Sequence, residues 1–212
     1  MGNLCGDAEA SGSPEGQSTR ANPDNVGQDR GGTAPPSSRR RASPQTPIAM
    51  NDQPERHHLT DAEATRALGR ELALRLQADC RPGQAPLLLL QGQLGAGKTC
   101  LVQGLAEALG IAEPITSPTF ALAQHYDAPG ATPLVHLDLY RLDQPAAAEE
   151  LLAQEEEEAM AQGAVLAVEW PERLRRLPAD GWRVHLELSD PDHPDAGRLA
   201  TVIPPQAAAA RP

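Results

Sequence analysis

One eight-residue stretch, GQLGAGKT at Gly92–Thr99, has the glycine and lysine spacing of a phosphate-binding loop. In such a loop, backbone N–H groups surround a phosphate, the lysine reaches the β- and γ-phosphates, and the last hydroxyl binds magnesium. Lys98 is the single lysine in the chain, whose other basic side chains are all arginines. A lysine ammonium is a compact point charge, whereas a guanidinium is a larger planar fork. A lysine kept only here therefore indicates that the compact head is required.

The residues of this loop form the predicted nucleotide-binding set. Gly92 and Gly97 allow the turn and the close approach of the backbone to a phosphate. The predicted contacts are Gly92, Gln93, Leu94, Gly95, Ala96, Gly97, Lys98, Thr99 and Cys100.

Two acidic residues are candidates for the second magnesium ligand that such sites usually have at the end of a neighbouring buried strand. Glu169 ends the apolar run AVLAVE, where an unpaired carboxylate would be costly, so a functional role is favoured. Asp138 lies in a partly polar stretch in which His136, Asp138 and Tyr140 alternate with aliphatic residues. We predict Thr99, Glu169 and Asp138 as metal ligands, and Lys98, Asp138 and Glu169 as catalytic residues.

The segments around the loop have the order that a nucleotide site needs. The apolar run APLLLL (85–90) predicts a strand buried on both faces, and TCLVQGLAEALG (99–110) predicts a helix stopped by Gly110. An earlier helix is predicted from position 58, with Thr60 and Glu63 as a capping box and leucines at helical spacing.

Further strands and helices alternate along the rest of the chain. The pattern predicts strands at 119–127, 133–142, 164–170, 182–190 and 197–203, a long helix at 145–163 and a short one at 171–177. This alternation predicts an α/β fold of the P-loop NTPase type, with a mixed, mostly parallel sheet and helices on both faces.

Composition divides the chain into three parts. Residues 1–55 contain almost no aliphatic side chains and are predicted to be a disordered tail, 56–204 the P-loop domain, and 205–212 a flexible C-terminal tail. The net charge of −11 argues against tight, direct binding of nucleic acid. Three widely spaced cysteines, no apolar run long enough for a bilayer and no signal-peptide core predict a cytoplasmic protein without membrane contact.

Four motifs in order, GQLGAGKT, TSPTF, HLDLYRL and VEWPE, resemble the TsaE (YjeE) family over about Leu59 to Ile203. This is the bacterial P-loop ATPase family needed to make threonylcarbamoyladenosine at position 37 of tRNA. The resemblance implies a small P-loop fold, ATP and Mg²⁺ as cofactors, slow hydrolysis by the isolated protein, and work with the TsaB and TsaD proteins. Contact with tRNA would be indirect, through that complex.

The resemblance also implies roles for particular residues. Thr99 and Glu169 would hold magnesium, and Asp138 would be an acid essential for hydrolysis. The remaining implied contacts are Ser117 and Thr119 in a switch-like loop near the γ-phosphate, Trp170 packed by the nucleotide, and Arg198 as a further nucleotide contact.

Some features depart from the family pattern or leave alternatives open. Gln93 replaces the usual acid and Cys100 the usual threonine, which bears on the hydrolysis rate rather than on binding. The acidic run Glu155–Glu158 is predicted to be a solvated helix face, with a partner contact as the alternative. A P-loop small-molecule kinase, using the arginines of PERLRRL (171–177) as a lid, and an ATP-gated protein-binding switch are the alternative functions.

Overall fold

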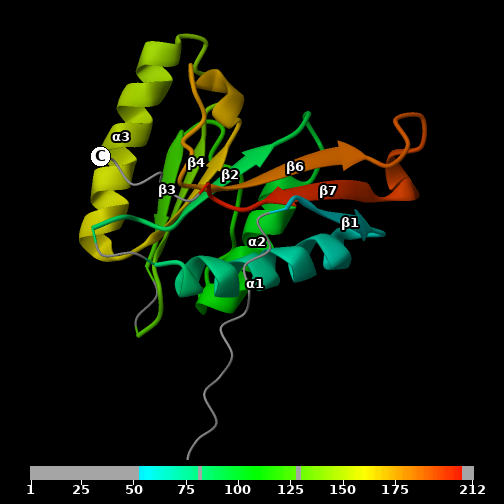
Figure 1. Ribbon diagram of the computed structural model, residues 1–212, viewed down its shortest axis with the longest axis horizontal. Helices are drawn as coiled ribbons and strands as arrows, with labels where there is room; N and C mark the ends of the chain where they lie inside the picture. The colour runs from blue at the N-terminus through cyan, green and yellow to red at the C-terminus, as the bar shows by residue number, and fades with distance from the viewer. Residues whose placement is uncertain (1–52, 81–82, 128–129, 207–212) are drawn as a thin grey trace, which may run out of the picture. The chain divides into compact units, whose positions relative to one another are not determined.

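The computed structural model describes residues 53–80, 83–127 and 130–206 (Figure 1). All of them belong to one of the chain's two compact units, Ile48–Pro212. The predicted N-terminal tail lies outside the described residues except at its end, where Glu55 begins a strand. Most of the predicted C-terminal tail also lies outside them.

A seven-stranded mixed sheet forms the centre, in the order β1-β7-β6-β2-β5-β4-β3. Its strands are β1 (Glu55–Leu59), β2 (Leu87–Gln91), β3 (Ala123–Tyr126), β4 (Leu134–Asp138), β5 (Val165–Glu169), β6 (Trp182–Leu188) and β7 (Arg198–Ile203). The strands β6, β2, β5 and β4 run parallel, whereas β1, β7 and β3 pair antiparallel. The predicted α/β fold with a mixed sheet is confirmed.

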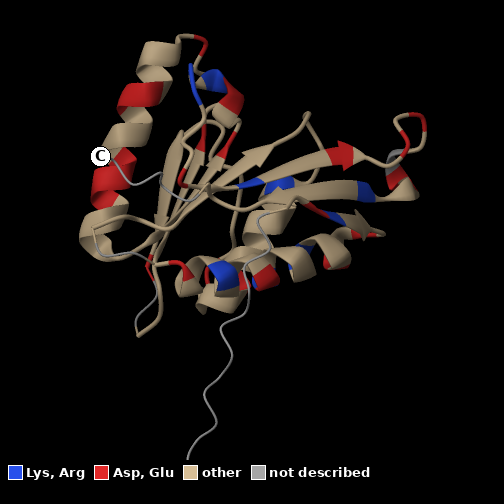
Figure 2. Ribbon diagram, in the orientation of Figure 1, with Lys and Arg blue, Asp and Glu red and all other residues tan. Residues whose placement is uncertain are grey.

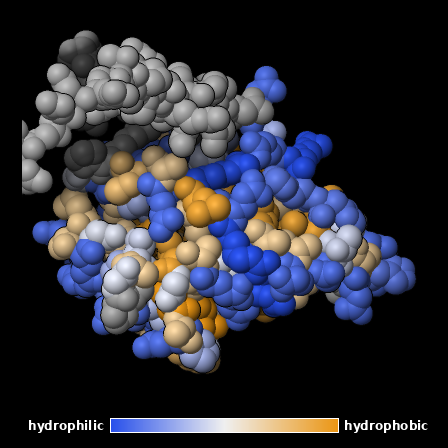
Figure 3. Space-filling view, turned by 90° about the horizontal axis from the view of Figure 1, so that it is seen from below, coloured by the Kyte–Doolittle hydropathy of each residue, from blue (hydrophilic) through white to orange (hydrophobic). Residues whose placement is uncertain are grey.

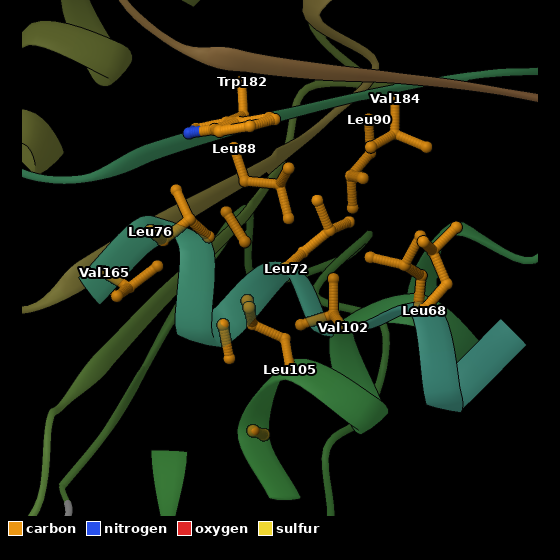
Figure 4. Packing of buried hydrophobic residues seen from close by; sticks show 14 of the residues in the cluster. Leu68, Leu72, Leu76, Leu88, Leu90, Val102, Leu105, Val165, Trp182 and Val184 are labelled. Atoms are coloured by element: carbon orange, nitrogen blue, oxygen red, sulfur yellow. The ribbon is translucent and has the colours of Figure 1, made fainter. Parts of the chain in front are cut away.

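Helices cover both faces of this sheet (Figure 1). The helices α1 (Ala62–Ala78) and α2 (Lys98–Leu109) pack on one face, and α3 (Pro145–Gln162) packs on the other. Two single turns of 3₁₀ helix, η1 (Pro171–Arg173) and η2 (Pro194–Ala196), follow β5 and β6. Figure 4 shows leucines of α1 and α2 packed against side chains of β2, β5 and β6.

Alternation along the parallel strands separates two hydrophobic cores. Leu88, Leu90, Leu134, Val165 and Ala167 belong to the core under α1 and α2, and their neighbours in sequence belong to the core under α3. Because side chains point alternately to the two faces, the polar residues of β4 and β5 point toward α2. These polar residues are His136, Asp138 and Glu169.

Two glycines bring α1 and α2 into backbone contact. A Cβ at Gly69 would lie 2.1 Å from the Leu101 carbonyl oxygen, and one at Gly104 would lie 2.0 Å from that of Arg66. Any larger side chain would push the helices apart. The close crossing with α1 therefore fixes the position of α2, the helix that follows the phosphate loop.

Several local predictions differ from the structure. The strands predicted at 119–127 and 133–142 are shorter, since the chain turns at 119–121 and 140–141. β1 was not predicted, because its polar sequence is stabilised by pairing with the distant strand β7. The capping box is wrong, since the helix begins one residue later with Asp61 as N-cap, whose carboxylate accepts from the Ala64 N–H at 2.7 Å. The short helix predicted at 171–177 is only one turn, because the backbone of Leu174 is extended and ends it.

The acidic run Glu155–Glu158 on α3 was predicted to be a solvated helix face, and this prediction is wrong for part of the run. Glu155 is buried and lies 2.8 Å from the His125 imidazole of β3, while Glu156 is half-buried and Glu157 and Glu158 are exposed. Figure 2 shows acidic and no basic residues on α3. The run crosses the edge of the helix's buried face, so its members have different environments.

The hydropathy of one face can be followed in Figure 3. The face seen from the α1 side is mainly hydrophilic, with small hydrophobic areas between charged side chains (Figure 3). Among the described residues, no helix has the length and apolarity needed to cross a membrane.

The burial of Glu156 makes a prediction about stability. Burial, with a smaller contribution from Asp180, raises the pKa of Glu156 above its usual 4.5. The carboxylate is thus disfavoured in the folded state, at a cost that is complete above the raised pKa and absent below about pH 4. We expect Glu156→Gln to raise the melting temperature at pH 7 by on the order of 1 °C and to have no such effect near pH 4.

Thermal denaturation at the two pH values measures this effect. Glu157→Gln, on the exposed face of the same helix, is the matched control and should change little. An equal gain from both substitutions would assign the effect to net charge instead of burial.

Candidate nucleotide-binding site

The phosphate loop joins the end of β2 to the start of α2. Gly92 has φ 141°, and a Cβ there would lie 2.3 Å from the Leu186 carbonyl oxygen of β6, so no other residue fits. Gly97, with φ 105°, is the N-cap of α2. The loop therefore presents its backbone at the positive end of a helix, where free N–H groups attract anions.

Lys98 is folded onto the loop that contains it. Its side chain is only 4% exposed, and Nζ donates to the carbonyl oxygens of Gly92 at 2.7 Å and Gln93 at 3.1 Å. Nζ also lies 3.9 Å from the centre of the Trp170 ring. Burial lowers the pKa of Lys98, while Glu169, Glu172 and Asp138 favour its charged form. The ammonium is thus held by weak neutral acceptors that a phosphate can replace.

Trp170 stands at the end of β5 in a left-handed backbone conformation, φ 60°. The backbone N–H of Trp170 donates to the Leu90 carbonyl oxygen at 3.1 Å, and the centre of its ring lies 4.8 Å from that of the Tyr140 ring. A non-glycine residue with positive φ costs roughly 1–2 kcal/mol. Such strain is typical of functional sites, and here it places the indole beside Lys98.

Glu169 connects three elements. Its Oε1 accepts from the Thr99 hydroxyl of α2 at 2.7 Å and lies 3.0 Å from Nε2 of His136 on β4. Both Glu169 and His136 are buried. The carboxylate is thus positioned beside the first turn of α2.

Asp138 lies next to Glu169 in the sheet register and holds the loop that precedes β3. Its Oδ2 accepts from the Thr119 hydroxyl at 2.5 Å and the Ser117 hydroxyl at 3.3 Å, and its Oδ1 accepts from the Tyr140 N–H at 2.9 Å. The TSPTF loop therefore reaches the site through this carboxylate.

The donor set fits magnesium bound together with a nucleotide. Thr99, Glu169 and Asp138 offer only oxygen, which Mg²⁺ prefers. No group of three or more His, Cys, Asp or Glu side chains suited to a metal occurs in the described part of the chain. Since Mg²⁺ usually takes its remaining ligands from phosphate and water, a site with few protein ligands agrees with this ion.

A hollow of about 360 Å³ lies beside the loop and is lined by Gly97, Cys100 and Arg198, among other residues. Arg198 begins β7, and its Nη2 donates to the Gly95 carbonyl oxygen at 3.3 Å. The Cys100 thiol donates to the Ala62 carbonyl oxygen at 3.4 Å, and burial raises its pKa. Arg198, far away in sequence, is therefore in direct contact with the phosphate loop.

The predicted residues converge on one place at the carboxyl ends of β2, β4 and β5. Gln93 and Leu94 are exposed at the tip of the loop, with Leu94 76% exposed, whereas Lys98 and Glu169 are buried. Sequence reasoning did not include His136 or Tyr140 in the site. The signal for both was present, because they alternate with aliphatic residues on either side of Asp138.

Residues 59–196 match the family model described as threonylcarbamoyl adenosine biosynthesis protein TsaE. The chain belongs to the TsaE family. The predicted family resemblance is therefore confirmed, and the matched range includes the phosphate loop, Asp138 and Glu169 but ends just before Arg198.

Known TsaE proteins and one solved structure resemble most of the described residues. A protein from Synechocystis named tRNA threonylcarbamoyladenosine biosynthesis protein TsaE is 44% identical over 61% of this chain and 78% of its own length. A Nostoc protein of the same name is 39% identical over 72% of this chain and 88% of its own. The crystal structure of YdiB from Bacillus subtilis superimposes with a TM-score of 0.50 at 25% identity, covering 73% of this chain and 87% of that one.

The close approach at Gly92 predicts different effects for two loop glycines. Gly92→Ala should destabilise the protein by about 3 kcal/mol or more, because the methyl group meets the Leu186 backbone. In Gly95→Ala nothing lies within 4 Å of the new Cβ, so only the strain of φ 76° remains, about 1–2 kcal/mol. Urea denaturation of the two variants measures the difference, and equal losses would contradict the contact with β6.

Proposed function

We propose that this protein is the ATP-binding and ATP-hydrolysing subunit of the machinery that forms threonylcarbamoyladenosine at position 37 of tRNA. The observation that carries the proposal is the convergence of Lys98, Thr99 and Glu169 at the start of α2, in a chain of the TsaE family. Family membership supports the biological role, and the geometry supports the nucleotide chemistry.

Binding would begin with the phosphates. Loop N–H groups and the start of α2 would hold the β-phosphate, and Lys98 would leave the Gly92 and Gln93 carbonyl oxygens for the β- and γ-phosphates. The nucleoside would extend into the hollow beside Cys100 and Arg198. Thr99 and Glu169 would hold magnesium, whose chemistry when bound is to neutralise charge on the phosphate oxygens.

Hydrolysis requires a water placed in line with the γ-phosphate, and Asp138 is the residue proposed to orient it. Its carboxylate stands beside Glu169 and carries the hydroxyls of Ser117 and Thr119. Three donors already occupy this carboxylate, which favours the role in hydrolysis over direct binding of the metal. The TSPTF loop would then sense the γ-phosphate through Asp138.

The partners follow from charge and family. A chain with a net charge of −11 repels phosphate backbones, so tRNA would be held by the TsaB and TsaD proteins, with this subunit docking on protein in the cytoplasm. Stimulation of the ATPase by these partners would couple hydrolysis to the modification cycle.

A small-molecule kinase is less well supported. Arg173 and Arg175, the proposed phosphate-clamping lid, form ion pairs with Asp143 and Glu149. These pairs connect the segment after β5 to the start of α3, which is a structural role. An ATP-gated switch differs from our proposal only in that partners would not accelerate hydrolysis.

ATP hydrolysis by the purified protein, alone and with TsaB and TsaD, tests the proposal. We expect partners to stimulate hydrolysis and Lys98→Ala to reduce it by about 100-fold. Lys98→Arg should fail as well, since the planar fork does not fit between the loop carbonyls and the Trp170 ring. The matched control is Arg176→Ala, an exposed arginine that the kinase alternative would require.

Two outcomes would contradict the proposal. ATP bound without stimulation by the partners would favour the passive switch. Transfer of the γ-phosphate to a metabolite, lost in Arg176→Ala, would favour the kinase.

Charge gives a separate prediction about tRNA. The isolated protein should not retain tRNA in a filter-binding or mobility-shift assay at physiological salt, because repulsion dominates. Addition of TsaB and TsaD should place both in one complex. Retention of bare tRNA by this protein alone would show that the docking model is wrong.

A further inference from the structure

His136 is a fully buried imidazole in the strand that carries Asp138. None of its surface is exposed, and its Nε2 lies 3.0 Å from Oε1 of Glu169. Because a carboxylate only accepts, Nε2 carries the proton in this bond. The nucleotide chemistry proposed above gives His136 no part.

The sheet register explains how the imidazole reaches the carboxylate. His136 pairs with Ala167 and Asp138 pairs with Glu169, so Glu169 is the diagonal neighbour of His136 on the face toward α2. Ala167, with its small side chain, leaves room for the ring to lie across β5. A larger residue at that position would separate the imidazole from Glu169.

Two donors hold Glu169, and both hold the same oxygen. The Thr99 hydroxyl and His136 Nε2 meet at Oε1, so the carboxylate cannot turn about its last bond without losing both contacts. In the proposed function Thr99 must give its hydroxyl to magnesium. Of these two donors, His136 is then the one that keeps Glu169 in place.

Burial of this imidazole is not explained by packing. Its Nδ1 has no hydrogen-bond partner within the described residues, so the side chain leaves one polar atom unsatisfied. An aliphatic side chain, like those of Leu134, Val135 and Leu137 in β4, would avoid that penalty. The bond to Glu169 is what His136 provides that a leucine would not.

We propose that His136 is a positioning residue, whose Nε2–H fixes the orientation of the Glu169 carboxylate for the magnesium–nucleotide complex. It touches neither nucleotide nor metal and acts through Glu169, as partners of metal-binding carboxylates do. The inference rests on the proposed function and adds a residue to it.

The test compares ADP affinity in Mg²⁺ with ADP affinity in EDTA, by calorimetry, for variants of the full chain. The Mg²⁺ gain is the ratio of the ADP affinity in Mg²⁺ to the ADP affinity in EDTA. His136→Leu removes the donor and should reduce this Mg²⁺ gain about tenfold or more, with the ADP affinity in EDTA unchanged. His136→Gln places an amide N–H at a similar reach and should restore most of the gain. His136→Asn, whose amide is too short to reach Glu169, should not.

Controls separate positioning from folding. Leu134→Met changes a buried residue on the same face of β4 and should leave the Mg²⁺ gain intact. If His136→Leu does not fold, the Gln and Asn variants still decide the question. Equal gains in those two, or a wild-type gain in a folded His136→Leu, would overturn the inference.

Glu169→Gln distinguishes this failure from failure of the function. If Glu169→Gln loses the Mg²⁺ gain while His136→Leu retains it, the positioning role of His136 is wrong and the proposed function stands. If the unaltered protein shows no effect of Mg²⁺ on ADP binding, the proposed function is wrong and the inference falls with it.

Discussion

A carboxylate buried at the end of a parallel strand has to be stabilised by its neighbours, and Glu169 connects the site through the groups that do so. The Thr99 hydroxyl ties it to the first turn of α2, and the His136 imidazole ties it to β4. Each partner comes from a different element. The relative placement of helix, loop and sheet therefore decides whether this charge is tolerated.

Backbone contacts provide that placement. Gly92 lets the phosphate loop pass against β6, and Gly69 and Gly104 let α1 press on α2. A side chain at any of these positions would overlap a backbone atom of the neighbouring element and force the two elements apart. The positions of the site residues are well defined because the loop meets β6, and α1 meets α2, through backbone atoms that cannot move aside as side chains can.

The sequence predicted those features for which the residue types needed for the chemistry occur within a clear local pattern of strand, loop or helix. The strand, loop and helix from Leu87 to Leu109 follow from an apolar run, glycine spacing and a glycine stop. Glu169 was predicted because an acid is unusual at the end of an apolar strand, and Asp138 because it lies in the second strand that could supply a magnesium ligand. Family membership was confirmed by the match to the family model, and the mixed α/β fold was confirmed by the structure.

What sequence missed depends on residues far apart in the chain. β1 is a strand because β7 lies beside it, and Glu155 is buried because β3 brings His125 to it. His136 was not among the predicted site residues, since its distance to Glu169 depends on the register of β4 and β5. The alternation around Asp138 places His136 on the same strand face, but no local pattern gives its distance to Glu169.

The alternation along β4 and β5 has an evolutionary consequence. The polar residues of these strands that point toward α2 must suit a charged site, whereas Val135, Leu137, Leu166 and Val168 point toward α3 into a hydrophobic core. Volume-conserving exchanges are tolerated in such a core. Successive positions at the carboxyl ends of these strands are therefore expected to tolerate substitution to different degrees, with more exchanges allowed on the α3 side than among the polar residues facing α2.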